Sequence, residues 1–160
     1  MDFYYPNFNN DMWRILGAVF FDDRNYFVQN PQRIFDREKI VEFLVWKGIG
    51  IYDTAEAVER LKGNASDAFL KVLVPTDVKA LLRKIPRAKA VVTTGTLATR
   101  TLAEELSAKE PPVGGKSPFS FDGSELNLYR MPSSSRAYPL AFEKKAEVYR
   151  KMFSELQMVP

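Results

Sequence analysis

A strand pattern that runs directly into a helix pattern is the feature that most restricts the fold of this chain. Residues 88–94 read AKAVVTT, a β-branched run that predicts a buried strand of a parallel sheet, and Gly95 ends it. Residues 96–106 follow at once with a helix pattern. Because strands that alternate with helices form α/β folds, we predict an α/β fold with a short, mostly parallel sheet.

Apolar residues at helical spacing predict most of the remaining structure. They mark helices over residues 12–21, 37–46 and 140–156, and a shorter helix through residue 82 that opens at the Pro-Thr-Asp sequence of residues 75–77. Caps are expected at Asn9 or Asn10 for the first helix and at Thr76 or Asp77 for the short one.

Further strand patterns lie on either side of the central strand. Residues 49–53, set off by Gly48, predict one strand, and residues 119–121 and 126–131 flank Asp122–Gly123, a turn pair typical of β-hairpins. The chain has 160 residues, which is the size of one ordinary domain, so a single domain over residues 1–160 is expected. Functional loops of such sheets lie at the carboxyl ends of the strands, here after Asp53, at Gly95 and at residues 132–135.

Composition excludes several kinds of chemistry. The chain has no cysteine and no histidine. Disulfides, thiolate nucleophiles, thiolate zinc sites, iron–sulfur clusters and Ser-His-Asp relays are therefore excluded. Catalysis would depend on Asp, Glu, Asn, Tyr, Ser, Lys or ordered water, and we expect neither a metal nor a cofactor.

The charge is uneven along the chain. Residues 1–70 carry 8 Lys and Arg against 11 Asp and Glu, whereas residues 71–160 carry 15 against 9. A basic second part suggests a polyanionic partner, although ordinary solvated Lys and Arg would give the same count. There is no apolar run of about 20 residues and no signal sequence at the start, so we expect a cytoplasmic protein without a membrane partner.

Three segments carry side chains that suit chemistry. Residues 4–13 (YYPNFNNDMW) combine flat tyrosines with neutral amides, although the tyrosines could equally belong to the core and the asparagines to a cap and turn. Residues 131–136 (MPSSSR) offer hydroxyls, backbone N–H groups and a cation to a phosphate, or form a polar loop before a helix. Gly95 between a strand and a helix lets an anion approach the helix dipole, or serves packing alone.

Taken in order, these segments resemble the uracil-DNA glycosylase superfamily, and most closely its mismatch-specific and hypoxanthine-DNA glycosylase branch. The branch shows a stretch like Y-Y/A-x-H-P-x-N-x-F-W opening a helix, which Tyr4, Tyr5, Asn10, Met12 and Trp13 match without a gap. Asn7 and Phe8 stand at its His and Pro. Other segments that look like family elements are residues 48–53 (strand G-I-A-L-W-D), 64–67 (base pocket), 91–95 (third strand and glycine) and 131–135 (L-P-S-x-S loop).

The resemblance implies a role for each of these residues. Asn10 would be the catalytic residue, positioning water or hydrogen-bonding the leaving base. Tyr5 would stack on the flipped base, with Tyr4 and Asn64 also in the base pocket. Contacts to the DNA backbone and to the gap in the duplex would come from Gly95, Ser133, Ser134, Ser135 and Arg136. This chemistry suits a chain without histidine, because neutral donors can stabilise the base anion that forms as the glycosidic bond breaks.

The resemblance also implies a three-layer α/β/α fold whose central first strand precedes the Tyr-Tyr stretch. No residues ahead of Tyr4 match that strand, so we expect Met1 to be an internal methionine of a longer parent chain. The implied function is a monomeric, monofunctional DNA glycosylase of base excision repair, acting on uracil or hypoxanthine in DNA. Two alternatives are a non-catalytic or truncated DNA-binding relative and a hydrolase of another N-glycoside on the same fold.

Overall fold

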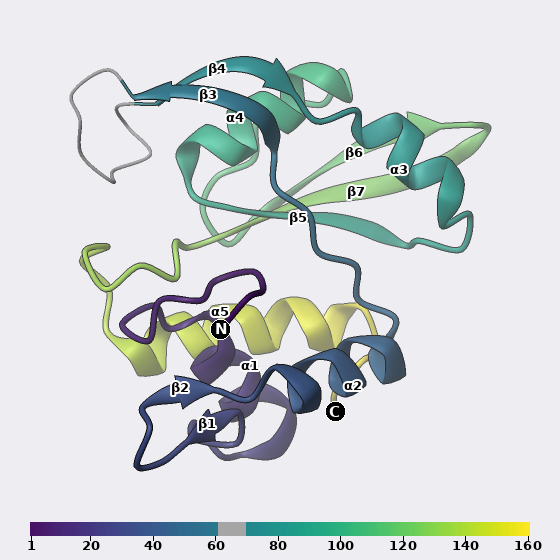
Figure 1. Cartoon of the computed structure of the whole chain (residues 1–160). Coiled ribbons are helices and arrows are strands. Elements are labelled where there is room, and N and C mark those ends of the chain that lie inside the picture. The colour runs from purple at the N-terminus through teal and green to yellow at the C-terminus, as the bar shows by residue number, and fades with distance from the viewer. Residues whose placement is uncertain (61–69) are drawn as a thin grey trace. The chain divides into compact units, whose positions relative to one another are not determined.

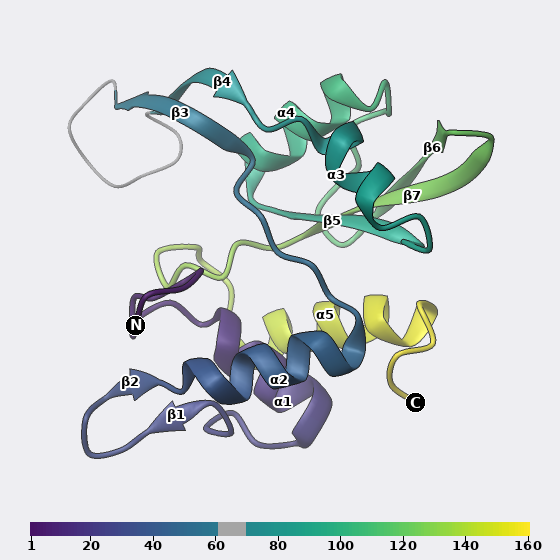
Figure 2. The same ribbon diagram turned by 45° about the vertical axis from the view of Figure 1, so that its right-hand side comes forward.

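The computed structural model describes residues 1–60 and 70–160, and it divides into two compact units (Figures 1 and 2). The first unit combines Met1–Tyr52 with Pro132–Pro160, and the second unit is Asp53–Met131. A single domain over residues 1–160 stays a prediction. No helix in the described part of the chain has the length and apolar composition that a membrane span requires.

Three helices build the first unit, and all three were predicted. They are α1 (Met12–Phe21), α2 (Arg37–Lys47) and α5 (Phe142–Glu155), with the short antiparallel strands β1 (Val28–Gln29) and β2 (Ile34–Phe35) between α1 and α2. Helices α1 and α5 pack against each other although 120 residues separate them in the sequence. The first unit is therefore built from residues that precede the second unit in the sequence and from residues that follow it.

Aromatic side chains form much of the core of the first unit. Phe20 of α1 lies between Phe43 of α2 and Phe153 of α5, with ring centroids 4.9 and 4.8 Å away. Trp13 and Phe27 are fully buried nearby and meet edge to face. Such pairs contribute about 0.5–1.5 kcal/mol each beyond the area they bury, so they fix how the three helices pack.

The start of α1 differs from the prediction. Its N-cap residue is Asp11, not Asn9 or Asn10, and within the described residues the Asp11 side chain makes no capping bond. Asn10 instead accepts a hydrogen bond from the Met12 N–H through its Oδ1 (2.9 Å). The physical reason is that the Asp11 carboxylate pairs with arginines, as described below, so the neighbouring amide satisfies the helix end.

The end of α2 explains why no strand forms over residues 49–53, where one was predicted. Gly48 has a left-handed φ of 68°, and its N–H bonds to Val45 while the Ile49 N–H bonds to Leu44 (2.9 Å). This is a Schellman arrangement, in which the residues after the helix satisfy its last carbonyls. Ile49 is thereby used to end α2, and residues 50–53 continue as an irregular connection.

The second unit holds two sheets and two helices. Strands β3 (Ala55–Arg60) and β4 (Leu70–Pro75) form an antiparallel pair. The larger sheet has the order β5-β7-β6, in which β5 (Ala90–Thr94) is parallel to β7 (Ser124–Met131), and β6 (Lys116–Phe121) is antiparallel to β7. The α/β class, the β5–α4 unit and the hairpin are confirmed. The sheet is mixed rather than mostly parallel, because the Asp122–Gly123 turn joins β6 to β7 as an antiparallel hairpin.

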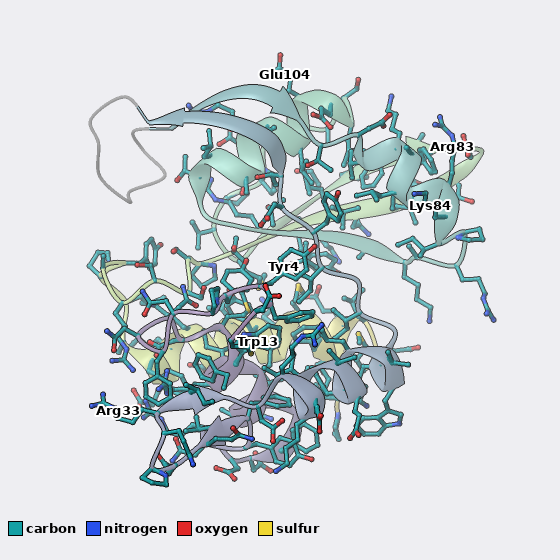
Figure 3. All side chains as sticks on the ribbon, viewed as in Figure 1. Tyr4, Trp13, Arg33, Arg83, Lys84 and Glu104 are labelled. Carbon is teal, nitrogen blue, oxygen red and sulfur yellow. The ribbon has the colours of Figure 1, made fainter. Side chains whose placement is uncertain are left out.

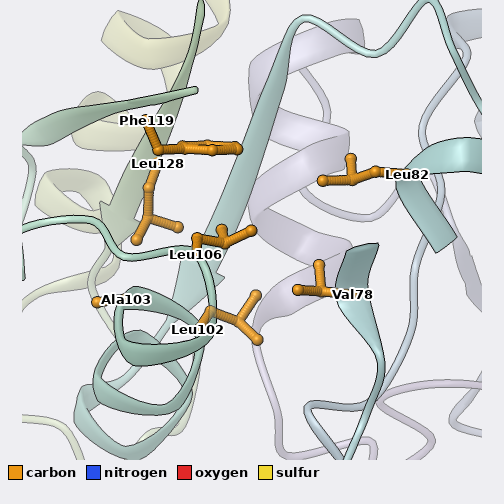
Figure 4. Packing of buried hydrophobic residues seen from close by; sticks show 7 residues of the cluster. All are labelled: Val78, Leu82, Leu102, Ala103, Leu106, Phe119 and Leu128. Atoms are coloured by element: carbon orange, nitrogen blue, oxygen red, sulfur yellow. The ribbon is translucent and has the colours of Figure 1, made fainter. Parts of the chain in front are cut away.

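Helices α3 (Val78–Lys84) and α4 (Thr96–Glu105) cover one face of the larger sheet (Figures 1 and 2). Asp77 caps α3 by accepting from the Ala80 N–H (3.0 Å), as one of the two predicted alternatives required. The buried cluster between the helices and the hairpin is drawn in Figure 4 and consists of Val78, Leu82, Leu102, Ala103, Leu106, Phe119 and Leu128. The larger sheet and these two helices therefore form two layers.

Candidate functional site

The N-terminal segment and the serine loop, residues 132–136, meet within the first unit. The Asp11 N–H donates to the Ser134 carbonyl (3.0 Å), and the Arg136 Nε donates to Asp11 Oδ1 (3.2 Å). These contacts join parts of the chain that lie more than 120 residues apart. Asn10, the residue directly before Asp11, is thereby held beside the loop that the sequence predicted as its partner.

The serines of the loop hold its backbone in a compact turn. Ser133 Oγ accepts from the Ser135 N–H, and Ser135 Oγ accepts from the Ala137 N–H, both at 3.2 Å. Each of these hydroxyls still has its own proton to donate to a phosphate oxygen. Ser134 is 2% exposed, and it joins the N-terminal segment through its carbonyl.

Two side chains from α5 donate hydrogen bonds to the backbone of the serine loop. Lys145 Nζ donates to the Ser135 carbonyl (2.8 Å), and the Tyr149 hydroxyl donates to the Pro132 carbonyl (2.9 Å). Both side chains are buried, with Lys145 only 1% exposed. Burial lowers the pKa of Lys145 and raises that of Tyr149, because water no longer solvates the charged forms. The loop is thus fixed near both of its ends by one helix.

A cluster of charges links these elements, and we call Asp11, Arg14, Arg136 and Lys145 the Asp11 cluster. Three of its members are buried, whereas the Arg136 side chain is half exposed. The Asp11 carboxylate lies 3.2 Å from Arg136 and 3.7 Å from Arg14. Burial lowers the pKa of Arg14 and that of Lys145, Arg136 lowers both further, and Asp11 opposes the change in each. With three cations and one anion, the cluster has an excess of positive charge next to the serine loop.

Arg14 also ties the cluster to the N-terminal segment. Its Nη1 donates to the carbonyls of Phe8 (2.7 Å) and Asn10 (3.3 Å), and its guanidinium lies 4.4 Å from the centre of the Phe8 ring. A planar cation with several donors can make all of these contacts at once, which lysine could not. The backbone of Asn10 is therefore held by a buried side chain one turn into α1.

The two tyrosines of the segment lie over α1. Trp13 Nε1 donates to the Tyr4 carbonyl (3.1 Å), and Figure 3 labels both residues. The Tyr5 ring meets the Trp13 ring edge to face, with centroids 6.2 Å apart. Tyr5 has a φ of 50°, a left-handed conformation that is costly for a bulky residue. After burial, its phenol is the second cause of the raised pKa of Tyr149.

Asn10 is half-buried and uses only part of its amide within the protein. Its Oδ1 accepts from Met12, whereas its Nδ2 has no acceptor among residues 1–60 and 70–160. A neutral amide N–H₂ group held by its own oxygen is suited to donate hydrogen bonds to a ligand. The side chain can therefore offer a donor without changing its charge.

The remaining predicted site residues lie elsewhere. Gly95 belongs to the second unit, where it precedes α4 with a φ of 85°. Its N–H, which was expected to approach a phosphate, donates to the Met131 carbonyl (3.4 Å). Arg130 Nη2 donates to Thr96 Oγ1 (3.1 Å) at the same helix end. Asn64 lies outside the described residues. In the described ranges, no group of three His, Cys, Asp or Glu side chains could hold a metal ion.

Asp11 and Lys145 were missed in the sequence. Asp11 looks like an ordinary acidic residue before a helix, and nothing local indicates that Arg136 would pair with it. Lys145 offered a signal, because it precedes Tyr149 by four residues and so lies on the buried face of α5. A lysine on such a face is unusual, since lysines are rarely buried without a partner.

Comparison with protein-family models, with curated proteins and with solved structures finds no match for this chain.

Proposed function

We propose that the chain is a DNA glycosylase domain of the uracil-DNA glycosylase type, which hydrolyses the N-glycosidic bond of a flipped uracil or hypoxanthine. The observation that carries the proposal is the contact between Asp11 and the Ser134 carbonyl, because it brings Asn10 and the serine loop into one site. A base-binding amide and a phosphate-binding loop must be neighbours in an enzyme that holds an extruded nucleotide.

The proposed reaction needs no titrating residue in the chain. As the bond between sugar C1′ and the base nitrogen breaks, the electron pair stays on the base. The Asn10 Nδ2 group would donate to this developing anion, a contribution of about 10²–10³ in rate for one such donor. Water then adds its hydroxyl to C1′, and its proton neutralises the base.

The other residues would bind rather than react. Tyr5 would stack on the extruded base, worth roughly 1–3 kcal/mol. The hydroxyls of Ser133 and Ser135, with the positive excess of the Asp11 cluster, would hold phosphates beside the extruded nucleotide. The same proposal includes the finer fold assignment, a three-layer α/β/α domain in which Gly95 approaches the backbone.

A cleavage assay with U·G, U·A and I·T duplexes tests the proposal. Asn10→Ala should lower the single-turnover rate by about 10²–10³ while DNA affinity changes little. Asn9→Ala is the matched control, since it removes the same amide from an exposed neighbour. Tyr5→Ala should weaken the preference for damaged over undamaged duplex.

Two results would contradict the proposal. If Asn10→Ala and Asn9→Ala cleave equally fast, the catalytic assignment is wrong. If the chain binds these duplexes but cleaves none of them, the non-catalytic DNA-binding alternative replaces it.

A further inference from the structure

A second concentration of positive charge lies in the second unit, at the end of α3 and in the turn that leads to β5. It consists of Arg83, Lys84, Arg87 and Lys89, four cations within seven residues, and we call it the α3 patch. All four are exposed, and Figure 3 shows Arg83 and Lys84 projecting from the end of α3. The Ala88 N–H donates to the Ile85 carbonyl (2.9 Å), and this turn brings the cations on its two sides near one another.

The acidic residues of the protein leave most of this charge uncompensated. Arg83 pairs with Asp122 at 3.8 Å, and both side chains are largely exposed. For Lys84, Arg87 and Lys89, no Asp or Glu of residues 1–60 and 70–160 lies within ion-pair distance. Three positive charges are therefore available to an outside partner.

The patch is separate from the phosphate site expected at Gly95. Lys89 directly precedes the first residue of β5, whereas Gly95 directly follows the last. A strand of five residues is roughly 16 Å long, so the two lie at opposite ends of β5. Any phosphates at the α3 patch are therefore additional to those at Gly95.

We propose that the α3 patch binds the phosphate backbone of DNA outside the reacting nucleotide. Duplex DNA carries one negative charge for about every 1.7 Å of its axis, so a group of cations such as this can meet several phosphates at once. A lipid surface fits less well, because a membrane-binding helix needs a free apolar face, and Val78 and Leu82 of α3 are buried in the core. The choice of DNA among polyanions rests on the proposed function.

The test compares two triple variants of equal charge change. The patch variant is Lys84→Gln, Arg87→Gln and Lys89→Gln, and the control is Lys109→Gln, Lys144→Gln and Lys151→Gln, which are exposed cations elsewhere. Affinity for an undamaged duplex is measured between about 50 and 200 mM salt, a range over which phosphate contacts weaken steeply as salt rises. The patch variant should lose about 2.7 from the slope of log affinity against log salt, and the control less than about 1.

Further readouts separate the possible failures. Circular dichroism of both variants should match the parent, and single-turnover cleavage at saturating DNA should be unchanged in the patch variant. Equal slopes in the patch and control variants would overturn the proposal. Loss of binding to phosphatidylserine vesicles without loss of DNA binding would overturn it in favour of a lipid surface. If the parent cleaves no duplex, the catalytic proposal fails while the slope comparison still decides whether the patch binds DNA.

Discussion

Asp11→Asn would remove the carboxylate that faces the cations of the Asp11 cluster while keeping the size of the side chain. Asp11 is 6% exposed, and its partner Arg14 is 5% exposed. After the substitution, Arg14 and Lys145 would remain buried with Arg136 beside them and no anion among them. We expect the first unit to be strongly destabilised, because an uncompensated buried charge is costly.

The magnitude follows from the distances. A unit-charge pair at 3.7 Å interacts by about 4–5 kcal/mol at an effective dielectric constant near 20. The Arg136 pair is closer, but the Arg136 side chain is half exposed, so water screens it and it adds much less. The lost attraction is partly offset because a neutral amide costs less to bury. The expected loss in the free energy of unfolding is therefore about 3 kcal/mol.

Urea denaturation followed by tryptophan fluorescence measures this loss, because both tryptophans, Trp13 and Trp46, lie in the first unit. Asp22→Asn is the control, since it removes an exposed carboxylate 3.4 Å from Arg150 and should cost less than about 1 kcal/mol. If Asp11→Asn costs no more than Asp22→Asn, the cluster does not stabilise the first unit and the reasoning is refuted.

Two further substitutions test the same unit. Lys145 has a lowered pKa in the folded protein, so the unfolded state binds more protons between that pKa and about 10.5. The free energy of unfolding, measured relative to Lys145→Met, should therefore rise with pH across this range. A difference between the two proteins that stays flat up to about pH 10.5 would contradict this prediction. Gly17→Ala should cost about 1–3 kcal/mol, because its Cβ would lie 2.5 Å from the Asp23 carbonyl oxygen, whereas Gly50→Ala meets no atom within 4 Å and should be nearly neutral in urea denaturation.

Local patterns predicted the helices and the hairpin because the information lies within a few residues. The α1 range agrees at both ends, and the pair Asp122–Gly123 located the β6–β7 turn. Strand β3 was not predicted, since its sequence AEAVER carries three charged residues and no apolar run. The strand expected at residues 49–53 has an apolar run but does not form. Its first residue, Ile49, ends helix α2, and residues 50–53 continue as an irregular connection.

The site was only partly predictable for a physical reason. The sequence pointed to Asn10 and the serine loop, and their proximity was an expectation from family resemblance. The Asp11–Arg136 pair spans 125 positions, a distance at which no periodicity operates. Lys145 could have been found from the spacing on α5. Its hydrogen-bond acceptor, the Ser135 carbonyl, could not, because every residue has a backbone carbonyl whatever its side chain.

The order of the two units along the chain has a consequence for biosynthesis. Helix α1 leaves the ribosome before the second unit, yet its partner α5 begins only at Phe142. At about 5–20 residues per second, the growing chain must wait roughly 6–24 s before α5 emerges. During this interval the second unit can complete its own contacts. Phe20 of α1 can already meet Phe43 of α2, but it still lacks Phe153 of α5. A nascent chain halted after Met131 would therefore leave the side of α1 that packs against α5 exposed, and this side would require chaperone protection.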